Sequence, residues 1–309
     1  MHDHNKTIMN VLSLQNVVKV YANHVAVDDV SFDVRASSIF GLLGPNGAGK
    51  TSLIRIITTI TAADSGKIFL NGQPLNHLHP NEIGYMPEER GLYKKMKVGE
   101  QLLYLAQLKG LSSKDAKIKL RAWLEKFEIL SWWDKKIGDL SKGMGQKVQF
   151  IATIVHDPKL IILDEPFSGL DPINTNLIKD EIYQLKQKGA SILFSTHRME
   201  QVEEICEDIV LMNKGKIILN GNVQEIKNDF KEHLFSVKYS GKAPSEMGTS
   251  EYETLSQNDN EIIFKTGPAF TSNDLLRELL NQNVNIVRFN EILPSLNEIF
   301  IKKVEANNE

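Results

Sequence analysis

The stretch "GPNGAGKT", Gly44–Thr51, decides the fold of this chain. It matches the pattern G-x-x-x-x-G-K-[S/T] and lies between a continuous apolar run, Ile39–Leu43, and a run with helical spacing, Thr51–Ile60. Strand, glycine-rich loop and helix in this order are the context that a phosphate loop requires. A tight turn with an incidental lysine would not need that context. The sequence therefore predicts a nucleotide site.

Each residue type in this loop suits the binding of phosphate. Three glycines, Gly44, Gly47 and Gly49, let the backbone curl so that its amides point at β- and γ-phosphate oxygens. Lys50 is expected to bridge the terminal phosphates as a catalytic residue, and Thr51 offers a hydroxyl to Mg²⁺. The helix that begins there adds its N-terminal dipole. The predicted nucleotide-binding residues are Gly44, Pro45, Asn46, Gly47, Ala48, Gly49, Lys50, Thr51 and Ser52.

Two carboxylates follow the apolar strand in "LIILDEP", Leu160–Pro166. Asp164 is expected to reach the hydration shell of Mg²⁺ from across the sheet. Glu165 is the predicted general base for an attacking water. Alone, such a pair is more often a polar strand end, but beside a phosphate loop the catalytic interpretation is favoured.

The strand "SILFSTH" ends in His197. A histidine at a strand end is usually structural. Neighbouring parallel strands end at one edge of a sheet, however, so we expect His197 near the γ-phosphate, where it would support catalysis.

The order of strands and helices predicts an α/β fold. The runs "KLIILDEP" and "GASILFSTH" flank the helical pattern "INTNLIKDEIYQLKQKG", which is typical of a parallel sheet covered by helices. A hairpin in "ADSGKIFLNGQPL" is expected to turn at Gly66 and Asn71–Gly72, and indicates antiparallel β structure. A helical insertion, Val98 to about Ile137, separates the two strand-rich halves, with Gly110 as a stop and Ser112 or Ser113 as an N-cap.

The character of the chain changes after about Glu225. Strands are predicted in "HLFSVKYSG", "NEIIFKTG" and "VNIVRFNEI", and helices in "TSNDLLRELLNQN" and "PSLNEIFIKKV". A polar stretch, Lys242–Asn260, separates the first two strands. We interpret residues 225–309 as a small α+β domain of its own.

Composition narrows the possible functions. The 309 residues are 41% hydrophobic and 24% charged, with a net charge of −3, which argues against a broad basic surface for nucleic acid. Cys206 is the only cysteine, so no internal disulfide forms, and we expect a reducing compartment and a buried thiol. We see no secretory signal, and apolar runs such as Leu160–Leu163 are far shorter than the ~20 residues of a membrane span. Any membrane spans are expected on another polypeptide.

In this order the motifs resemble those of the ATP-binding subunit of ABC (ATP-binding cassette) transporters, bacterial export type. The resemblance covers residues 10–222, with a helical subdomain at about 92–145. It rests on Tyr21, "GPNGAGKT", "PEERGLY", "LSKGMGQ", "LIILDEP", "SGLD" and "STH". It implies a P-loop NTPase core, ATP and Mg²⁺ as ligands, and ATP hydrolysis coupled to transport.

The resemblance also implies roles for single residues. Tyr21 would stack on adenine, although an aromatic at a strand end can also be a core residue. Asp171 of "SGLD" would lie in the loop through which two ATP sites communicate. The signature segment "LSKGMGQ", with Ser141, Gly143 and Met144, would contact ATP held by a partner subunit, so that two nucleotides lie between two chains.

The sequence departs from the family pattern at two motifs. The family signature is Leu-Ser-Gly-Gly-Gln. This chain has Lys142 in place of the first Gly and Met144 in place of the Gln. Its remaining Ser141 hydroxyl and Gly143 amide predict a working signature with altered affinity. The loop "YMPEERGLY" has Glu88 where the family has glutamine, and we expect this carboxylate to ligate Mg²⁺. The glutamate and the small C-terminal domain resemble a subset associated with sodium or drug efflux.

The motifs are compatible with three functions. The first, and our choice, is an ATPase subunit on the cytoplasmic face of the membrane, powering export through separate permease subunits as a homodimer or heterodimer. The second is a soluble ABC ATPase acting on nucleic acid or ribosomes, and the third a regulatory module that binds ATP without transport. The second would need two cassettes or a long coiled coil, and the third predicts loss of Glu165 or His197, both of which are present.

Overall fold

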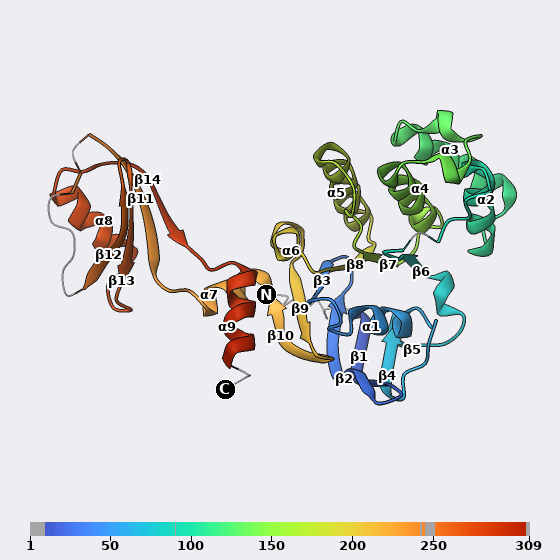
Figure 1. Ribbon diagram of the computed structural model, residues 1–309, viewed down its shortest axis with the longest axis horizontal. Coiled ribbons are helices and arrows are strands. Elements are labelled where there is room, and N and C mark those ends of the chain that lie inside the picture. The colour runs from blue at the N-terminus through green and yellow to red at the C-terminus, as the bar shows by residue number, and fades with distance from the viewer. Residues whose placement is uncertain (1–9, 90, 242, 245–250, 307–309) are drawn as a thin grey trace, which may run out of the picture. The chain divides into compact units, whose positions relative to one another are not determined.

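The computed structural model describes residues 10–89, 91–241, 243–244 and 251–306. The chain divides into two compact units, Met1–Asn222 and Val223–Glu309; in the described residues the first has two sheets and the second has one (Figure 1). Within the described residues, no helix has both the length and the apolar character needed to cross a membrane.

A sheet of order β10-β9-β3-β8-β7-β6 forms the centre of the first unit. Its neighbours pair in parallel, except that β10 is antiparallel to β9. Every residue of β3, β7 and β8 is buried, as the apolar runs predict for strands covered on both faces. The strands are β3 (Ile39–Leu43), β6 (Ile83–Met86), β7 (Leu160–Asp164), β8 (Ser191–Thr196), β9 (Asp208–Asn213) and β10 (Lys216–Asn222).

A second, antiparallel sheet has the order β2-β1-β4-β5. Asn71 and Gly72 turn between β4 and β5, both with positive φ, as predicted. The predicted turn at Gly66 is wrong, because this glycine lies inside β4, where a Cβ would come 2.4 Å from the carbonyl oxygen of Asn16 on β1. The strands are β1 (Asn10–Tyr21), β2 (His24–Arg35), β4 (Ser65–Leu70) and β5 (Gln73–Pro74).

Helices cover the parallel sheet and form the insertion. α1 packs on β2, α4 on β6, and both α5 and α6 on β8. The helix predicted over Thr51–Ile60 is α1, but it ends at Ile57 because the backbone of Thr59 turns to positive φ. Ser112 caps α3 and Gly110 follows α2 with φ +88°, as expected. The helices are α1 (Lys50–Ile57), α2 (Val98–Leu108), α3 (Ser113–Lys126), α4 (Lys142–Ile154), α5 (Pro172–Gln187) and α6 (Met199–Ile205), with 3₁₀ turns η1 (His79–Asn81), η2 (Leu130–Trp132) and η3 (Ile137–Asp139).

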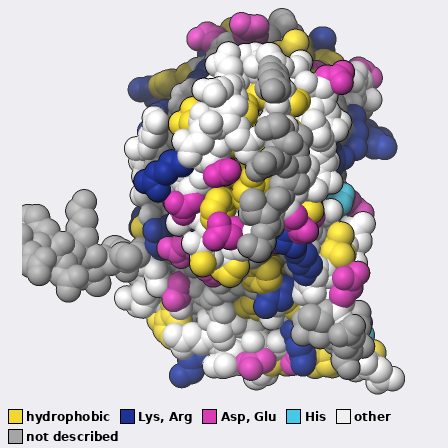
Figure 2. Space-filling view, turned by 90° about the vertical axis from the view of Figure 1, so that its left-hand side faces the viewer, with side chains coloured by type: hydrophobic (Ala, Val, Ile, Leu, Met, Phe, Trp, Pro, Cys, Tyr) yellow, Lys and Arg dark blue, Asp and Glu magenta, His cyan; other side chains and the backbone are white. Residues whose placement is uncertain are grey.

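The second unit is a sheet of order β12-β13-β11-β14. Phe235, Val237, Ile262 and Phe264 form its core with Leu275 of α8. Strand β12 lies in the polar stretch Lys242–Asn260, for which the sequence predicted no strand. In a view of this unit's face (Figure 2), apolar side chains lie interspersed with acidic ones. The elements are α7 (Val223–Asp229), β11 (Leu234–Ser240), β12 (Tyr252–Asn258), β13 (Glu261–Thr266), α8 (Ser272–Asn281), β14 (Asn285–Ile292) and α9 (Leu296–Ala306).

The architecture confirms the predicted fold class. It has a parallel-sheet core, an antiparallel β sheet, a helical insertion and an α+β C-terminal unit. The thiol of Cys206 is buried, as expected, and burial raises its pKa well above the usual value.

Candidate functional site

The parallel register brings the predicted site residues to one edge of the sheet. β8 lies between β3, which leads into the phosphate loop, and β7, which ends in Asp164. Leu43 pairs with Thr196, and Asp164 pairs with Ser195. The loop after β3, the carboxylates after β7 and the residues after β8 therefore leave the sheet side by side.

Steric limits explain the glycines of the phosphate loop. A Cβ at Gly44 would come 2.3 Å from the carbonyl oxygen of Met212, and one at Gly49 would come 2.2 Å from that of Ala26. Gly47 has open space around it but a φ of +81°, which side chains adopt only with strain. Gly49 is the N-cap of α1 and has no side chain with which to cap it, so the amides of the first turn stay available for an anion.

Lys50 lies across this loop. Its ammonium donates hydrogen bonds to the carbonyl oxygens of Gly44, at 2.6 Å, and Pro45, at 3.1 Å. Burial lowers the pKa of Lys50, and the nearby charges of Glu165 and Asp164 oppose that shift. The cation therefore sits among loop carbonyls and carboxylates, at the place where the chain would receive a phosphate.

Asp164 is 3% exposed and ends β7. The hydroxyl of Ser195 donates to its Oδ1 at 2.8 Å. Burial, with smaller contributions from the charges of Glu165 and Glu88, raises the pKa of Asp164 to about 6. Burial therefore disfavours the charged form of Asp164, and a bound cation would offset that penalty.

Glu165 is held by the residues that follow β8. The hydroxyl of Thr196 donates to its Oε2 at 3.0 Å, and the backbone N–H of His197 donates to its Oε1 at 2.9 Å. Nδ1 of His197 lies 2.6 Å from the same Oε1. The backbone of Glu165 has a φ of +50°, which is rare for a side-chain-bearing residue and re-aims the carboxylate.

A cavity of about 230 Å³ collects most of the predicted site residues. Tyr21, the phosphate loop from Asn46 onward, Glu88, Asp164 and Glu165 line it, whereas Gly44 and Pro45 of the loop do not. His197 lies behind Glu165, and Ser141, Gly143, Met144 and Asp171 are not among its lining residues. His24, which the sequence did not single out, lines the same cavity. The complete lining is Tyr21, His24, Ala26, Asn46, Gly47, Ala48, Gly49, Lys50, Thr51, Ser52, Glu88, Asp164 and Glu165.

Tyr21 stands at the entrance to this cavity. Its side chain is 41% exposed, and it pairs with His24 across the hairpin between β1 and β2. The ammonium of Lys19 lies 5.4 Å from the ring centroid and forms an ion pair with Asp64 at 2.8 Å. Lys19 thus covers one part of the ring, and an exposed ring surface remains for stacking.

The loop that bears Glu88 is tied to α4. Nε2 of Gln149, a buried side chain, donates to the carbonyl oxygen of Pro87 at 2.8 Å. Glu88 itself is exposed and turned toward the cavity that Asp164 and Glu165 line. Gln149, Ser195 and Thr196 are supporting residues that sequence reasoning missed, because their partners are distant in sequence.

The signature segment begins α4. Ser141 is the N-cap, and its Oγ accepts a hydrogen bond from the backbone N–H of Met144 at 3.3 Å. Asp171 caps α5 in the same way, and its Oδ1 accepts from the backbone N–H of Asn174 at 2.9 Å. That bond lowers the pKa of Asp171. Both segments are exposed helix starts outside the cavity.

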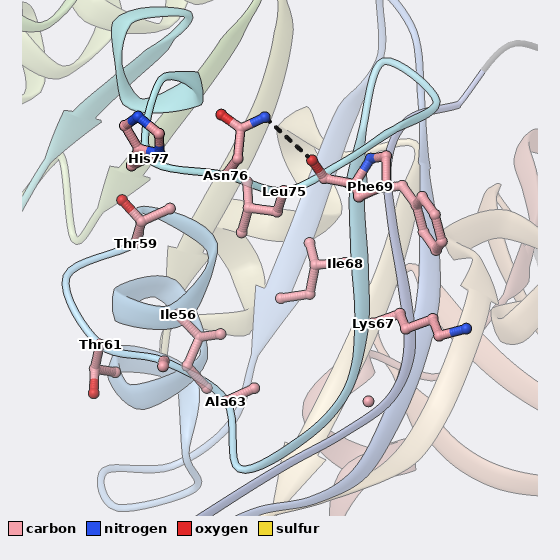
Figure 3. A pocket seen from close by; sticks show the side chains of 13 residues that line it. Ile56, Thr59, Thr61, Ala63, Lys67, Ile68, Phe69, Leu75, Asn76 and His77 are labelled. Carbon is pink, nitrogen blue, oxygen red and sulfur yellow. Dashed lines mark hydrogen bonds between the residues drawn. The ribbon is translucent and has the colours of Figure 1, made fainter.

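A larger cavity, about 650 Å³, lies at the far end of α1 (Figure 3). Ile56, Ala63, Ile68 and Leu75 make it apolar, and Lys67 extends away from them in Figure 3. No carboxylate lines it, and it lacks the helix N-terminus that favours phosphate. The smaller cavity is therefore the candidate for nucleotide chemistry.

The donor set fits Mg²⁺ that is shared with a nucleotide. Thr51, Glu88 and Asp164 offer a hydroxyl and carboxylate oxygens, which are hard ligands. Within the described ranges, no cluster of three or more acidic, histidine or cysteine side chains could hold a metal alone. Mg²⁺ in nucleotide enzymes usually completes its shell with phosphate oxygens and water, so such a cluster is not required.

Comparison with known proteins identifies the family. A family model described as "ABC transporter" matches residues 27–168, and one described as "ATP-binding protein DrrA1-3-like, C-terminal domain" matches residues 221–304. The chain is 40% identical over 308 residues to the uncharacterized ABC transporter ATP-binding protein YhaQ of Bacillus subtilis, which covers 96% of this chain and 99% of that protein.

One further relative and one solved structure each match about 70% of the chain. The lipopolysaccharide export system ATP-binding protein LptB of Haemophilus influenzae is 33% identical over 227 residues, covering 72% of this chain and 94% of that one. A solved structure, described as the ATP binding subunit of an ABC transporter, superimposes with a TM-score of 0.67 and 30% identity over 71% of this chain and 93% of that chain. With a phosphate loop beside two buried carboxylates, the chain belongs to the ATP-hydrolysing, ATP-binding subunits of the ABC transporter family.

Proposed function

We propose that this subunit powers export by hydrolysing Mg-ATP at the cavity beside the phosphate loop. The observation that carries the proposal is that Glu165, Lys50 and the amides of the loop line one cavity. In the proposal Tyr21 stacks on adenine, while the loop Gly44–Thr51 and Ser52 hold the phosphates.

Glu165 acts as the general base. Its carboxylate accepts a proton from water as the water oxygen attacks the γ-phosphorus. The bond from that phosphorus to the β,γ-bridging oxygen breaks, which gives ADP and phosphate. Thr196 and His197 hold both carboxylate oxygens of Glu165, so this base is fixed before the reaction. Lys50 and the loop amides stabilise charge on the transferring phosphoryl group.

Thr51, Asp164 and Glu88 would hold Mg²⁺. The ion would neutralise charge on the β- and γ-phosphate oxygens. The raised pKa of Asp164, caused by burial and by the neighbouring carboxylates, supports a cation at this position. Glu88 is the weaker ligand of the three, because its side chain is exposed.

The signature acts on a second nucleotide. Ser141, Gly143 and Met144 lie at an exposed helix N-terminus outside the chain's own cavity, which supports a role toward ATP held by a partner subunit. Asp171 begins the neighbouring helix and would communicate between the two sites. Two subunits, of one kind or two, would close around two ATP molecules.

The coupling to transport is through permease subunits. ABC ATP-binding subunits work with membrane components, and LptB is named for an export system, which favours export over the nucleic-acid and regulatory alternatives. The subunit would then sit at the cytoplasmic face of the membrane, held by its permease.

A groove beside Glu88 suits the permease contact. It is a cavity of about 270 Å³ between β6, α2 and α4, lined by Pro87, Leu105, Leu108 and Gln149 among others. Burial lowers the pKa of His156 in its wall to about 4, so that the imidazole is neutral. Among the described residues, Oε1 of Gln149 has no hydrogen-bond partner. An apolar permease side chain with an adjacent N–H donor would fit this lining.

Glu165→Gln tests the proposed site. The amide keeps the shape of the side chain but cannot take the proton, so steady-state hydrolysis should fall about 10²-fold or more. ATP binding should persist, and the purified variant should form an ATP-dependent dimer on size exclusion. Hydrolysis at the parent rate would remove Glu165 as the base.

A further inference from the structure

Lys142 connects the signature segment to the loop that follows Glu165. Its ammonium donates to Oγ of Ser168 at 3.0 Å. Its aliphatic stem crosses Gly169, where a Cβ would come 2.4 Å from Cδ of Lys142. Gly169 also has a φ of +75°, so both the backbone and the lysine stem favour glycine there.

A second contact joins the same two segments. Gln146 is 3% exposed, and its Nε2 donates to the carbonyl oxygen of Pro166 at 2.8 Å. The first turns of α4 thus hold the loop at Pro166, next to Glu165, and again at Ser168. Figure 1 shows α4 and α5 standing beyond the ends of β7 and β8, with this loop leading from β7 into α5.

The hydrogen bond to Ser168 does not by itself explain why this position carries a lysine. Lys142 is the first residue of α4, and a cation at a helix N-terminus opposes the helix dipole. In the described part of the chain no ion pair joins it to an acidic side chain, and the acceptor of its hydrogen bond is a neutral hydroxyl. A phosphate at the start of α4 would be a stronger partner for both the ammonium and the dipole.

We propose that Lys142 is a positioning residue that exchanges partners. It holds Ser168 until ATP bound by a second copy of this chain brings its γ-phosphate to the start of α4. The ammonium then moves to that phosphate and frees the loop behind Glu165. This inference rests on the proposed function, because it requires the signature to act in trans.

The exchange predicts different effects on the ATP-dependent dimer when Lys142 and when Ser168 is replaced. In a Glu165→Gln background, Lys142→Met should weaken the ATP-dependent dimer about 10-fold or more, because a charged contact to phosphate is lost. Ser168→Ala should leave the dimer unchanged or tighten it, because the lysine no longer has to leave an acceptor. Lys142→Arg should restore dimer formation, and Lys147→Met, further along α4, serves as the control.

The measurement is the dimer dissociation constant from analytical ultracentrifugation at saturating ATP, with ATP binding to each monomer as a check on folding. If Lys142→Met and Ser168→Ala weaken the dimer alike, Lys142 only fastens the loop and the exchange is wrong. If the Glu165→Gln parent forms no ATP-dependent dimer, the trans signature itself fails, and both the proposed dimer and this inference are overturned.

Discussion

Nδ1 of His197 lies 2.6 Å from Oε1 of Glu165, and the backbone N–H of the same histidine donates to that oxygen at 2.9 Å. One residue thus holds one carboxylate oxygen through two atoms. The side chain and the backbone can be separated by mutation, because only the imidazole is lost in an alanine variant.

His197→Ala should lower kcat about 10²-fold, because the imidazole contact that holds the carboxylate of Glu165 is lost. ATP binding should stay within about twofold, because the backbone contact to Glu165 remains and the imidazole is outside the phosphate cavity. Steady-state phosphate release and equilibrium binding of a fluorescent ATP analogue would measure the two effects. His77→Ala, an exposed histidine, is the control. An unchanged kcat in His197→Ala would show that the ring is dispensable.

Asp164→Asn should stabilise the chain in the absence of nucleotide and Mg²⁺. A carboxyl whose pKa is raised to about 6 on folding contributes stability that is present at low pH and lost as pH rises through 6. At pH 7.5 that loss is about 3 kcal/mol, and the amide variant avoids it. The gap in thermal midpoint between variant and parent should widen from pH 4 to pH 7.

The matched control for this pH series is Asp33→Asn, an exposed position on β2. A constant gap between Asp164→Asn and the parent across the whole series would contradict the raised pKa. The stabilised variant should also hydrolyse ATP poorly, since Asp164 is a proposed Mg²⁺ ligand.

Gly49→Ala should both destabilise the first unit and abolish ATP binding. Its Cβ would come 2.2 Å from the carbonyl oxygen of Ala26 at a φ of +105°, so we expect a loss of about 2–3 kcal/mol or more. Gly72→Ala, with φ +75° and no atom within 4 Å, should lose only about 1 kcal/mol and keep binding. Chemical denaturation of both variants gives the comparison, and equal losses would rule out the steric explanation.

Leu108→Glu should weaken association with the permease and leave the hydrolysis of the isolated subunit unchanged. Leu108 is 60% exposed and lines the groove beside Pro87, so a charge there would meet an apolar partner surface. Ile118→Glu changes an equally exposed residue of α3, 60%, that does not line the groove. Co-purification with the permease from detergent extracts should separate the two variants; equal recovery would place the contact elsewhere.

Local sequence patterns correctly predicted those helices, strands and caps that a few consecutive residues determine. The apolar run Ile39–Leu43 and the cap at Ser112, one of the two serines considered, are such cases. Strand β12 was missed because its residues, "YETLSQN", are mostly polar and exposed, and an edge strand with one thinly covered face has no strong alternation. The turn predicted at Gly66 was wrong because the backbone of β1, which leaves room only for glycine there, is distant in the sequence.

The same distinction applies to the site. The phosphate loop could be predicted because the spacing of its glycines, Lys50 and Thr51 within one short segment determines the shape of the loop. The hydroxyls of Ser195 and Thr196 could not, because their carboxylate partners are reached only through the register of β7 with β8. Their one available signal was their position directly before His197. The contact of Lys142 with Ser168 is of the same kind, since it joins the start of α4 to the loop between β7 and α5, which is distant from it in sequence.

The two units keep separate interiors. Among the described residues, the core around Phe235 and Phe264 shares no member with the core that includes Leu53 and Ile54 of the phosphate-loop helix. A mutation that loosens one interior therefore does not spread through shared side chains to the other. A substitution at Phe264 therefore acts first on the packing of the C-terminal unit, and a substitution at Leu53 acts first on the packing behind the phosphate loop.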